Sequence, residues 1–284
     1  MELLSQAAPV AMLSFVVSSM LAMGAGLTVA QIIEPLRDVR LVALALLANF
    51  IVMPLGAFAL AKVLRLDEPL GIGLLLLGCA AGAPFLPKLV QLAKGNLAFA
   101  VGAMVLLMLV TVGYLPIVLP LLLPGVTVDS WKIARSLVML MLLPLAAGLT
   151  LKAYYPGLAA KAKPILDLIS NISLILFVLL IVAANIDKVL DVFGTRGILA
   201  ALLFIGLGCA TGWLLSGRGN ETRRVLALGT AQRNIAAAIV VASGSFSDPR
   251  VVVMVIVVAI VGLIVLILLS RALGKQPTIV TRRT

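Results

Sequence analysis

The sequence predicts an all-α integral membrane protein. Of its 284 residues 63% are hydrophobic, with a mean hydropathy of +1.23, whereas soluble domains are about 45–50% apolar. The apolar runs are continuous and about 20 residues long, as spanning helices require, and lack the alternation of a transmembrane β-barrel. The connections are short, so we expect one transmembrane domain over residues 1–274 and a basic, disordered tail over 275–284.

We expect nine spanning helices, each assigned to an apolar run about as long as a bilayer is thick. Basic residues mark the connections between them. In chain order the runs cover 9–32, 39–61, 70–93, 97–123, 133–152, 165–186, 197–217, 222–244 and 250–273. In the same order the connections carry Arg37 and Arg40, Lys62 and Arg65, Lys94, Lys132, Lys152 with Lys161 and Lys163, Lys188 and Arg196, Arg218, and Arg250.

The placement of the basic residues predicts the orientation. Lys and Arg are more numerous on the side shared with the C-terminus, so the positive-inside rule places the N-terminus outside and the C-terminus in the cytoplasm of a cell (inner) membrane. No basic residue precedes the first apolar run, so we expect a retained helix and not a cleaved signal peptide. The lipid bilayer is the expected partner, and the sequence leaves monomer and homodimer open.

Composition excludes several classes of function. The net charge of +11 is explained by the loops and the tail, so we expect no nucleic-acid partner. The chain has no histidine, and Cys79 and Cys209 lie within apolar runs, so we expect no metal site, cofactor or disulfide. Paired intramembrane carboxylates and an activated nucleophile are also missing, which argues against an enzyme.

Two spanning runs are interrupted. In the third, Gly82, Pro84 and Pro87 fall within six residues, and each proline removes a backbone donor. In the eighth, Gly229 is followed by the polar run 230–234. Freed carbonyls must be buried in protein or line a wet cavity. Interrupted segments five helices apart predict a transporter with an inverted repeat, with one helix missing from the first copy, and a binding site at the midplane.

A full positive charge lies beside each break, and such intramembrane charges usually serve a function. Lys88 follows the first break and either belongs to the site or reaches out to the interface. Arg233 lies within the second break and either grips a carboxylate in a bidentate manner or caps carbonyls inside the protein. Positive charge at both breaks predicts an anionic substrate.

Short motifs along nearly the whole chain resemble those of the bile acid:sodium symporter family. The segment 23–28 is similar to the family's Met-Gly-x-Gly-Leu-Thr, and 49–54 to its Gln-Phe-x-x-Met-Pro. Leu143-Pro144 with Gly148 matches a further element, and Gln232 with Asn234 matches the second broken helix. The resemblance implies secondary transport of organic anions by alternating access. It implies a core of segments near 39–123 and 197–273, with two crossing discontinuous helices, and a panel of segments near 9–32 and 133–186.

The chain departs from the family where sodium would bind. Leu86 and Pro87 stand where relatives have Ser and Asn, and Leu228 stands where they have Glu. Further hydroxyl positions fall on Ala100 and Met104. Most side-chain sodium ligands are therefore missing, so sodium coupling is doubtful, and the built-in cations can take the place of a diffusible one.

We therefore predict a secondary active or facilitative transporter of a small or amphipathic organic anion. In this hypothesis transport is either uncoupled or coupled to protons through Lys88, and it is not coupled to sodium. The alternatives are a sodium-coupled symporter that uses carbonyls and Gln232, and an anion channel. The candidate substrate-binding residues are Arg233, Asn234, Gln232, Lys88, Pro84 and Asn49, and the candidate cation-coupling residues are Lys88, Thr230 and Gln232.

Overall fold

A computed structural model describes residues 2–33, 37–123, 129–184, 192, 195–216 and 219–275, and these residues are helical apart from short connections. The first half contains α1 (Glu2–Gly26), α2 (Val29–Ile33), α3 (Val39–Leu47), the π-helical turn η2 (Ala48–Val52), α4 (Met53–Val63), α5 (Glu68–Cys79), α6 (Leu86–Leu92) and α7 (Leu97–Leu122). The second half contains α8 (Ser130–Leu137), the π-helical turn η3 (Val138–Leu142), α9 (Leu143–Tyr154), α10 (Pro156–Ala184), α12 (Gly197–Leu215), α13 (Asn220–Ala231), α14 (Ile235–Ser245) and α15 (Pro249–Lys275).

Seven helices in the described part of the chain are long and apolar enough to cross a membrane. They account for seven of the nine expected segments, and the multi-pass helical class is confirmed. The count of nine is not established, because the third segment is divided into α5 and α6 and the sixth corresponds to α10, which is not among the seven. The expected disordered tail lies outside the described residues, apart from Lys275 at the end of α15.

Two expected boundaries were wrong. The first segment, expected to run to residue 32, ends as α1 at Gly26, and a separate short helix α2 follows. The sixth, expected to start at 165, begins at Pro156 and continues through Pro164. Pro156 occupies the first position of the helix, where a proline costs little because the N–H group there has no intrahelical acceptor, whereas Pro164 lies inside the helix. Polar residues therefore extend α10 beyond its apolar run.

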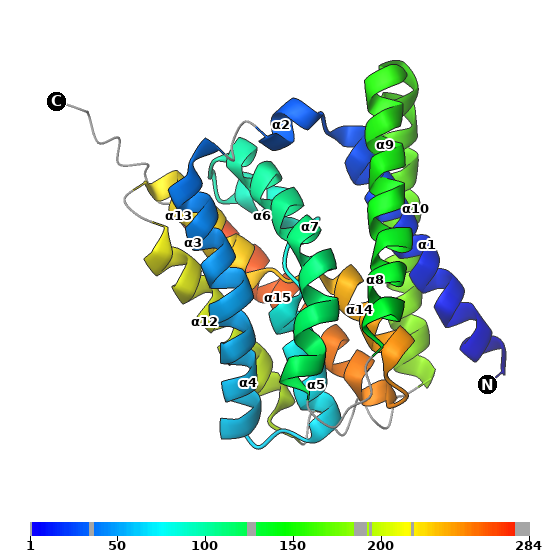
Figure 1. Cartoon of the computed structure of the whole chain (residues 1–284), viewed down its shortest axis with the longest axis vertical. Helices are drawn as coiled ribbons and strands as arrows, with labels where there is room; N and C mark the ends of the chain where they lie inside the picture. The colour runs from blue at the N-terminus through cyan, green and yellow to red at the C-terminus, as the bar shows by residue number, and fades with distance from the viewer. Residues whose placement is uncertain are drawn as a thin grey trace.

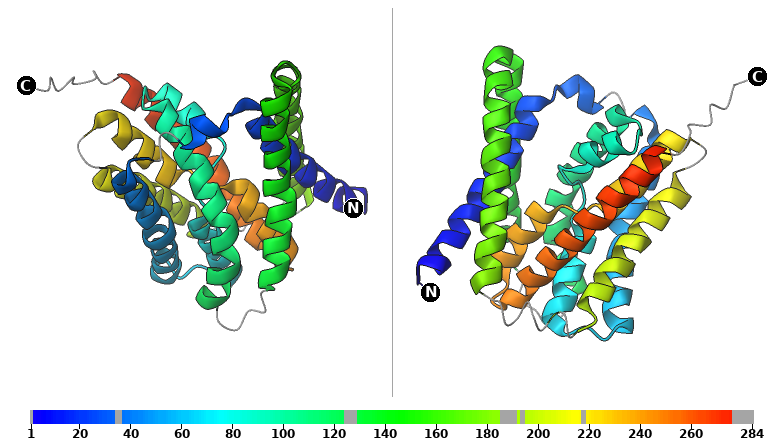
Figure 2. Two further views of the ribbon diagram at one scale, coloured as in Figure 1. Left: turned by 45° about the horizontal axis from the view of Figure 1, so that its top comes forward. Right: turned by 180° about the vertical axis from the view of Figure 1, so that it is seen from behind.

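The helices form two groups (Figure 1). We call α1, α9 and α10 the panel, because they pack against one another along one side of the molecule, and the remaining long helices the core. Seen from behind, α15 runs obliquely across the core, and the start of α1 and the end of α15 lie at opposite ends of the bundle (Figure 2). This arrangement leaves the interrupted helices α5–α6 and α13–α14 inside the core.

Both predicted interruptions are confirmed. α5 ends at Cys79 and α6 begins at Leu86, and α13 ends at Ala231 and α14 begins at Ile235. In the combined stretch of α13 and α14, 94% of the most apolar window is buried. The polar groups of a helix so enclosed must find hydrogen-bond partners within the protein, because neither lipid nor bulk water surrounds the helix.

Prolines elsewhere lie inside helices or at their first turns without dividing them. Pro116 and Pro120 lie inside the continuous helix α7. Pro54 and Pro144 each occupy the first turn of a helix that directly follows a π-helical turn, η2 or η3. The wider turn accommodates the proline ring and leaves carbonyls free for other donors. η2 thereby supplies acceptors to the site described below.

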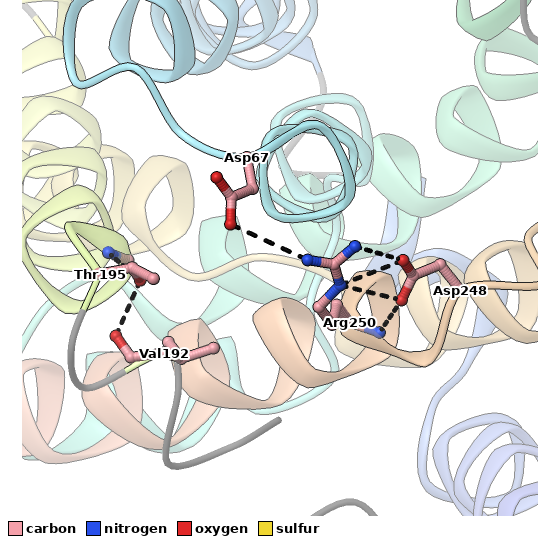
Figure 3. A network of polar contacts seen from close by, with 6 residues as sticks. Asp67, Val192, Thr195, Asp248 and Arg250 are labelled. Carbon is pink, nitrogen blue, oxygen red and sulfur yellow. Dashed lines mark hydrogen bonds and ion pairs between the residues drawn. The ribbon is translucent and has the colours of Figure 1, made fainter. Parts of the chain in front are cut away.

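An ion-pair network joins the starts of α5 and α15 (Figure 3). The guanidinium of Arg250 contacts the carboxylate of Asp248 at 2.8 Å and that of Asp67 at 3.9 Å. Beside it, the hydroxyl of Thr195 donates to the carbonyl of Val192 at 2.8 Å. These half-exposed pairs tie connections together at the end of the bundle where α1 begins, away from the two helix breaks.

Candidate functional site

The two helix breaks are hydrogen-bonded to each other. The backbone N–H of Asn234 donates to the carbonyl of Ala80 at 2.9 Å, and its side-chain Nδ2 donates to the carbonyl of Gly82 at 3.1 Å. The Oδ1 atom of Asn234 accepts from the N–H of Ala237 at 3.1 Å and so caps α14. Asn234 therefore joins the first break to the second and satisfies carbonyls that the end of α5 leaves free.

The backbone of the first break is fixed by close contact with α7. Gly82 has a φ of +80°, and a Cβ atom placed on it would lie 2.2 Å from the backbone nitrogen of Met108. Only glycine fits both requirements. The hydroxyl of Thr111 accepts from the N–H of Ala81 at 2.9 Å and donates to the carbonyl of the same residue at 3.0 Å. The sequence analysis did not identify Thr111, whose single hydroxyl in an apolar run gave little signal.

Arg233 occupies a cage of protein oxygens at the crossing and is 3% exposed. Its Nε donates to the carbonyl of Leu77 at 2.8 Å and its Nη2 to that of Gly78 at 2.7 Å, which caps the end of α5. Its Nη1 donates to the carbonyl of Thr230 at 3.0 Å and to Oδ1 of Asn49 at 2.6 Å. Nη2 also approaches the carbonyl of Asn49 at 3.5 Å. A guanidinium has five N–H groups, so these five acceptors match its donor capacity.

Asn49 and Thr230 form the wall of this cage. Asn49 belongs to the π-helical turn η2, and its Nδ2 donates to the carbonyl of Ala45 at 2.9 Å and to the hydroxyl of Thr230 at 3.4 Å. Both residues are fully buried. No carboxylate contacts the guanidinium in the described part of the chain, so carbonyl and amide dipoles alone compensate the charge of Arg233.

A cavity of about 830 Å³ lies beside the crossing, between the panel and the core. The core side of its lining includes Pro84, Lys88, Gln232 and Arg233, and the panel side includes helices α1 and α10. The wall is mostly apolar, with isoleucines of α14 and α15 facing leucines of α10. A largely apolar cavity with a few polar groups is the usual form of a small-molecule site.

Two polar side chains on the core side of the cavity have no partner among the described residues. The ammonium of Lys88, on α6, is exposed and makes no hydrogen bond or ion pair with them. Gln232 is only 6% exposed, yet its side-chain amide makes no hydrogen bond with them either. The Oγ atom of Ser270 is the one buried side-chain polar atom without a partner in the described part of the chain, so the amide of Gln232 keeps contact with the cavity, where water or a ligand can bind it.

The structure divides the predicted site residues into two sets. Pro84, Lys88, Gln232 and Arg233 line the cavity. Asn49, Thr230 and Asn234 are not part of its lining and are engaged in hydrogen bonds within the protein. Arg233 lines the cavity as well, but its donors point to the oxygen cage. The carbonyl-capping role that the sequence left open for Arg233 is the one that its hydrogen bonds display.

Sequence reasoning missed the panel side of the cavity. Lys163 and Asp167 of α10 line it and form an ion pair with N and O atoms 2.5 Å apart. Ser170 and Asn171 follow on the same wall. The sequence does contain a signal for this wall. A lysine and an aspartate four residues apart are followed by two small polar residues in an otherwise apolar helix, and this spacing places the two charges on one face.

The fold and the site together define a polytopic helical membrane protein with two interrupted helices that meet at a buried polar crossing beside a cavity. The model of the sodium bile acid symporter family matches residues 12–192, which is more than half of the chain. The chain therefore belongs to the sodium bile acid symporter family. The matched range includes the first break, and the second break lies beyond it.

Relatives extend the similarity over more of the chain. The "Probable sodium/metabolite cotransporter BASS2, chloroplastic" of Oryza sativa subsp. japonica is 29% identical over 250 residues, which are 82% of this chain and 57% of the relative. The "Uncharacterized sodium-dependent transporter YocS" of Bacillus subtilis is 30% identical over 69% of this chain and 61% of its own length. The "Probable sodium/metabolite cotransporter BASS1, chloroplastic" of Arabidopsis thaliana is 27% identical over 81% of this chain and 58% of its own length. The chain spans about three-fifths of the length of these relatives.

Proposed function

We propose that this protein transports a small or amphipathic organic anion across the cell membrane by alternating access, as a secondary active or facilitative transporter. The cavity between panel and core is the substrate site, with Lys88 as the anion-binding group and Gln232 as a hydrogen-bonding group. The N-terminus lies outside and the C-terminus in the cytoplasm. Membership of a symporter family and the printed names of the relatives support the class of activity.

The observation that carries this proposal is the ammonium of Lys88 on the wall of the cavity, which has no partner among the described residues. A carboxylate beside it gains a charge-assisted hydrogen bond. The apolar wall accepts the body of the substrate, and Gln232 offers a donor and an acceptor at the deep end, next to the crossing. Pro84 contributes to the wall and keeps backbone carbonyls of the first break without a helical partner.

Arg233 is the built-in cation of this mechanism. It places a permanent positive charge among carbonyl and amide oxygens that are the preferred ligand type of a hard cation such as sodium. While the guanidinium fills the cage, sodium cannot use Asn49 and Thr230 there. The guanidinium of Arg233 thus takes the place of a cation bound from solution. A substrate anion then does not need a bound sodium ion at this position.

Sodium-coupled symport is the second candidate function, because the family and the relatives carry sodium in their names. Sodium would then bind outside the Arg233 cage, with the amide oxygen of Gln232 and carbonyls of the first break as ligands. The dependence of uptake on a sodium gradient distinguishes this candidate from uncoupled or proton-coupled transport.

Substitution of Lys88 by glutamine should weaken the binding of carboxylates about tenfold or more, the equivalent of ~1.4 kcal/mol, because it removes an ammonium on the core wall that has no partner in the described part of the chain. We would measure the Kd of 4-methylbenzoate for the purified full chain by isothermal titration calorimetry. Lys132→Gln, which changes an exposed lysine of α8 outside the cavity, is the matched control and should leave the Kd unchanged.

Uptake of labelled 4-methylbenzoate and of cholate into proteoliposomes, with sodium, potassium or proton gradients, tests transport itself. Saturable uptake that Lys88→Gln reduces and that a sodium gradient does not drive is the expected result. Strict dependence on sodium would replace the proposal by the second candidate. Failure of every carboxylate to bind, or equal binding by the wild type and Lys88→Gln, would refute the assignment of the site.

A further inference from the structure

The panel wall of the cavity contains an ion pair that faces the same space as Lys88. Lys163 and Asp167 lie one turn apart on α10, and both line the cavity. Lys88 lies on α6, on the core side. A substrate between the two groups therefore meets, on one wall, a positive charge that no described residue pairs with and, on the other, two charges that neutralise each other.

We propose that Asp167 determines the charge of the accepted substrate by restricting the cavity to monoanions. This inference rests on the proposed function, because it concerns the same cavity. Asp167 is the one acidic residue of the lining in the described part of the chain, and its carboxylate neutralises Lys163. One carboxylate of a substrate is satisfied by Lys88, and a second carboxylate would face a lysine whose charge is already compensated and an aspartate that repels it.

The physical basis is the placement of like charges beside one another on the wall of the cavity. Specificity can come from repulsion of the wrong ligand as well as from attraction of the right one. The side chain of Lys163 lies against α1, because a Cβ atom on Gly26 would be 2.7 Å from its Cε atom. Its ammonium is therefore near the wall of the cavity, where it can bind an anion when Asp167 is neutralised.

The pair is suited to substitution, because it is not needed for the fold. The side chains of Lys163 and Asp167 are 44% and 46% exposed, and exposed ion pairs of this kind contribute only about 0–1 kcal/mol. Neutralising either residue should therefore leave a folded protein with a changed charge on the panel wall.

The test compares two ligands that share one body, 4-methylbenzoate as a monoanion and terephthalate as a dianion. The measured quantity is the ratio of their Kd values for the purified full chain, by isothermal titration calorimetry. In the wild type we expect the monoanion to bind more tightly. In Asp167→Asn the ratio should shift about tenfold towards the dianion, which corresponds to ~1.4 kcal/mol, because Lys163 is freed.

Lys163→Gln should shift the ratio in the opposite direction, because it leaves Asp167 unpaired, and the double substitution should restore the ratio of the wild type. Glu221→Gln, an exposed acid of α13 outside the cavity, is the matched control. A ratio that stays within about twofold in both single variants, while 4-methylbenzoate still binds through Lys88, would overturn this inference alone. Failure of both ligands to bind to the wild type would instead refute the proposed function.

Discussion

Replacement of Arg233 by methionine should lower the melting temperature of the purified protein more than removal of any other polar side chain named here. The guanidinium donates to carbonyls of Leu77, Gly78 and Thr230, which join α5 to α13. Each buried carbonyl without a donor costs roughly 1–3 kcal/mol. Arg233→Lys keeps the charge but offers three donors in place of five, so we expect an intermediate loss. Thermal unfolding of the two variants beside the wild type measures the difference.

A rescue experiment separates a structural cap from a cation site. In Arg233→Ala the cage of oxygens remains, and guanidinium or sodium ions can enter it. We expect low, non-denaturing concentrations of either cation to raise the melting temperature of this variant, since a ligand that binds only the folded state stabilises it by mass action. The wild type, whose cage is filled, should not respond. An equal response of both proteins would show that the oxygens do not form a cation site.

Substitution of Gly82 by alanine should abolish the folded protein or reduce its stability by about 4 kcal/mol or more. The residue has a φ of +80°, and an added Cβ would meet the backbone of Met104 and Met108, which cannot move away. The first break would have to separate from α7, and with it the carbonyl that accepts from Asn234. The yield of monodisperse protein and its melting temperature report the effect.

Gly113→Ala is the matched control for this substitution. Gly113 lies on α7, the helix that Gly82 contacts, but a Cβ atom placed on it meets nothing within 4 Å. Alanine also has a better helix propensity than glycine by about 1 kcal/mol. The control should therefore be neutral or slightly stabilising. Similar losses of stability in both variants would mean that any methyl group added at or near α7 is destabilising. The first break would then have no particular requirement for glycine at position 82.

The fold class and both breaks were predictable, because they depend on local chemistry. Long apolar runs identify membrane helices, and Gly82 together with Pro84 and Pro87 within six residues marks the first break. The break at Gln232, Arg233 and Asn234 was predictable from Gly229 and the polar run 230–234 in an apolar context, together with the resemblance to the family. Helix ends were less predictable where polar residues continue a helix, as in the first turns of α10, since tertiary packing rather than hydropathy decides them.

The partners of the charged residues could not be predicted from the sequence. Whether Arg233 faces a substrate or caps carbonyls depends on how α13 and α5 approach each other, which is a property of the fold. Arg233 and Gln232 are both buried, yet the donors of Arg233 are occupied, whereas the side chain of Gln232 has no partner among the described residues. The proposed role of Asp167 likewise depends on α10 and α6 lining the same cavity, which the sequence does not show.

The hydrogen bonds between the two breaks have a consequence for the motion of the protein. Asn234 and Arg233 bind α5 and α13–α14 into one unit, so neither interrupted helix is free to swing alone. If the protein transports by the proposed alternating access, we expect the relative displacement at the boundary between panel and core, where the cavity lies. On that proposal, a bivalent ligand that binds Lys88 at one end and α10 at the other should block transport without contacting the crossing.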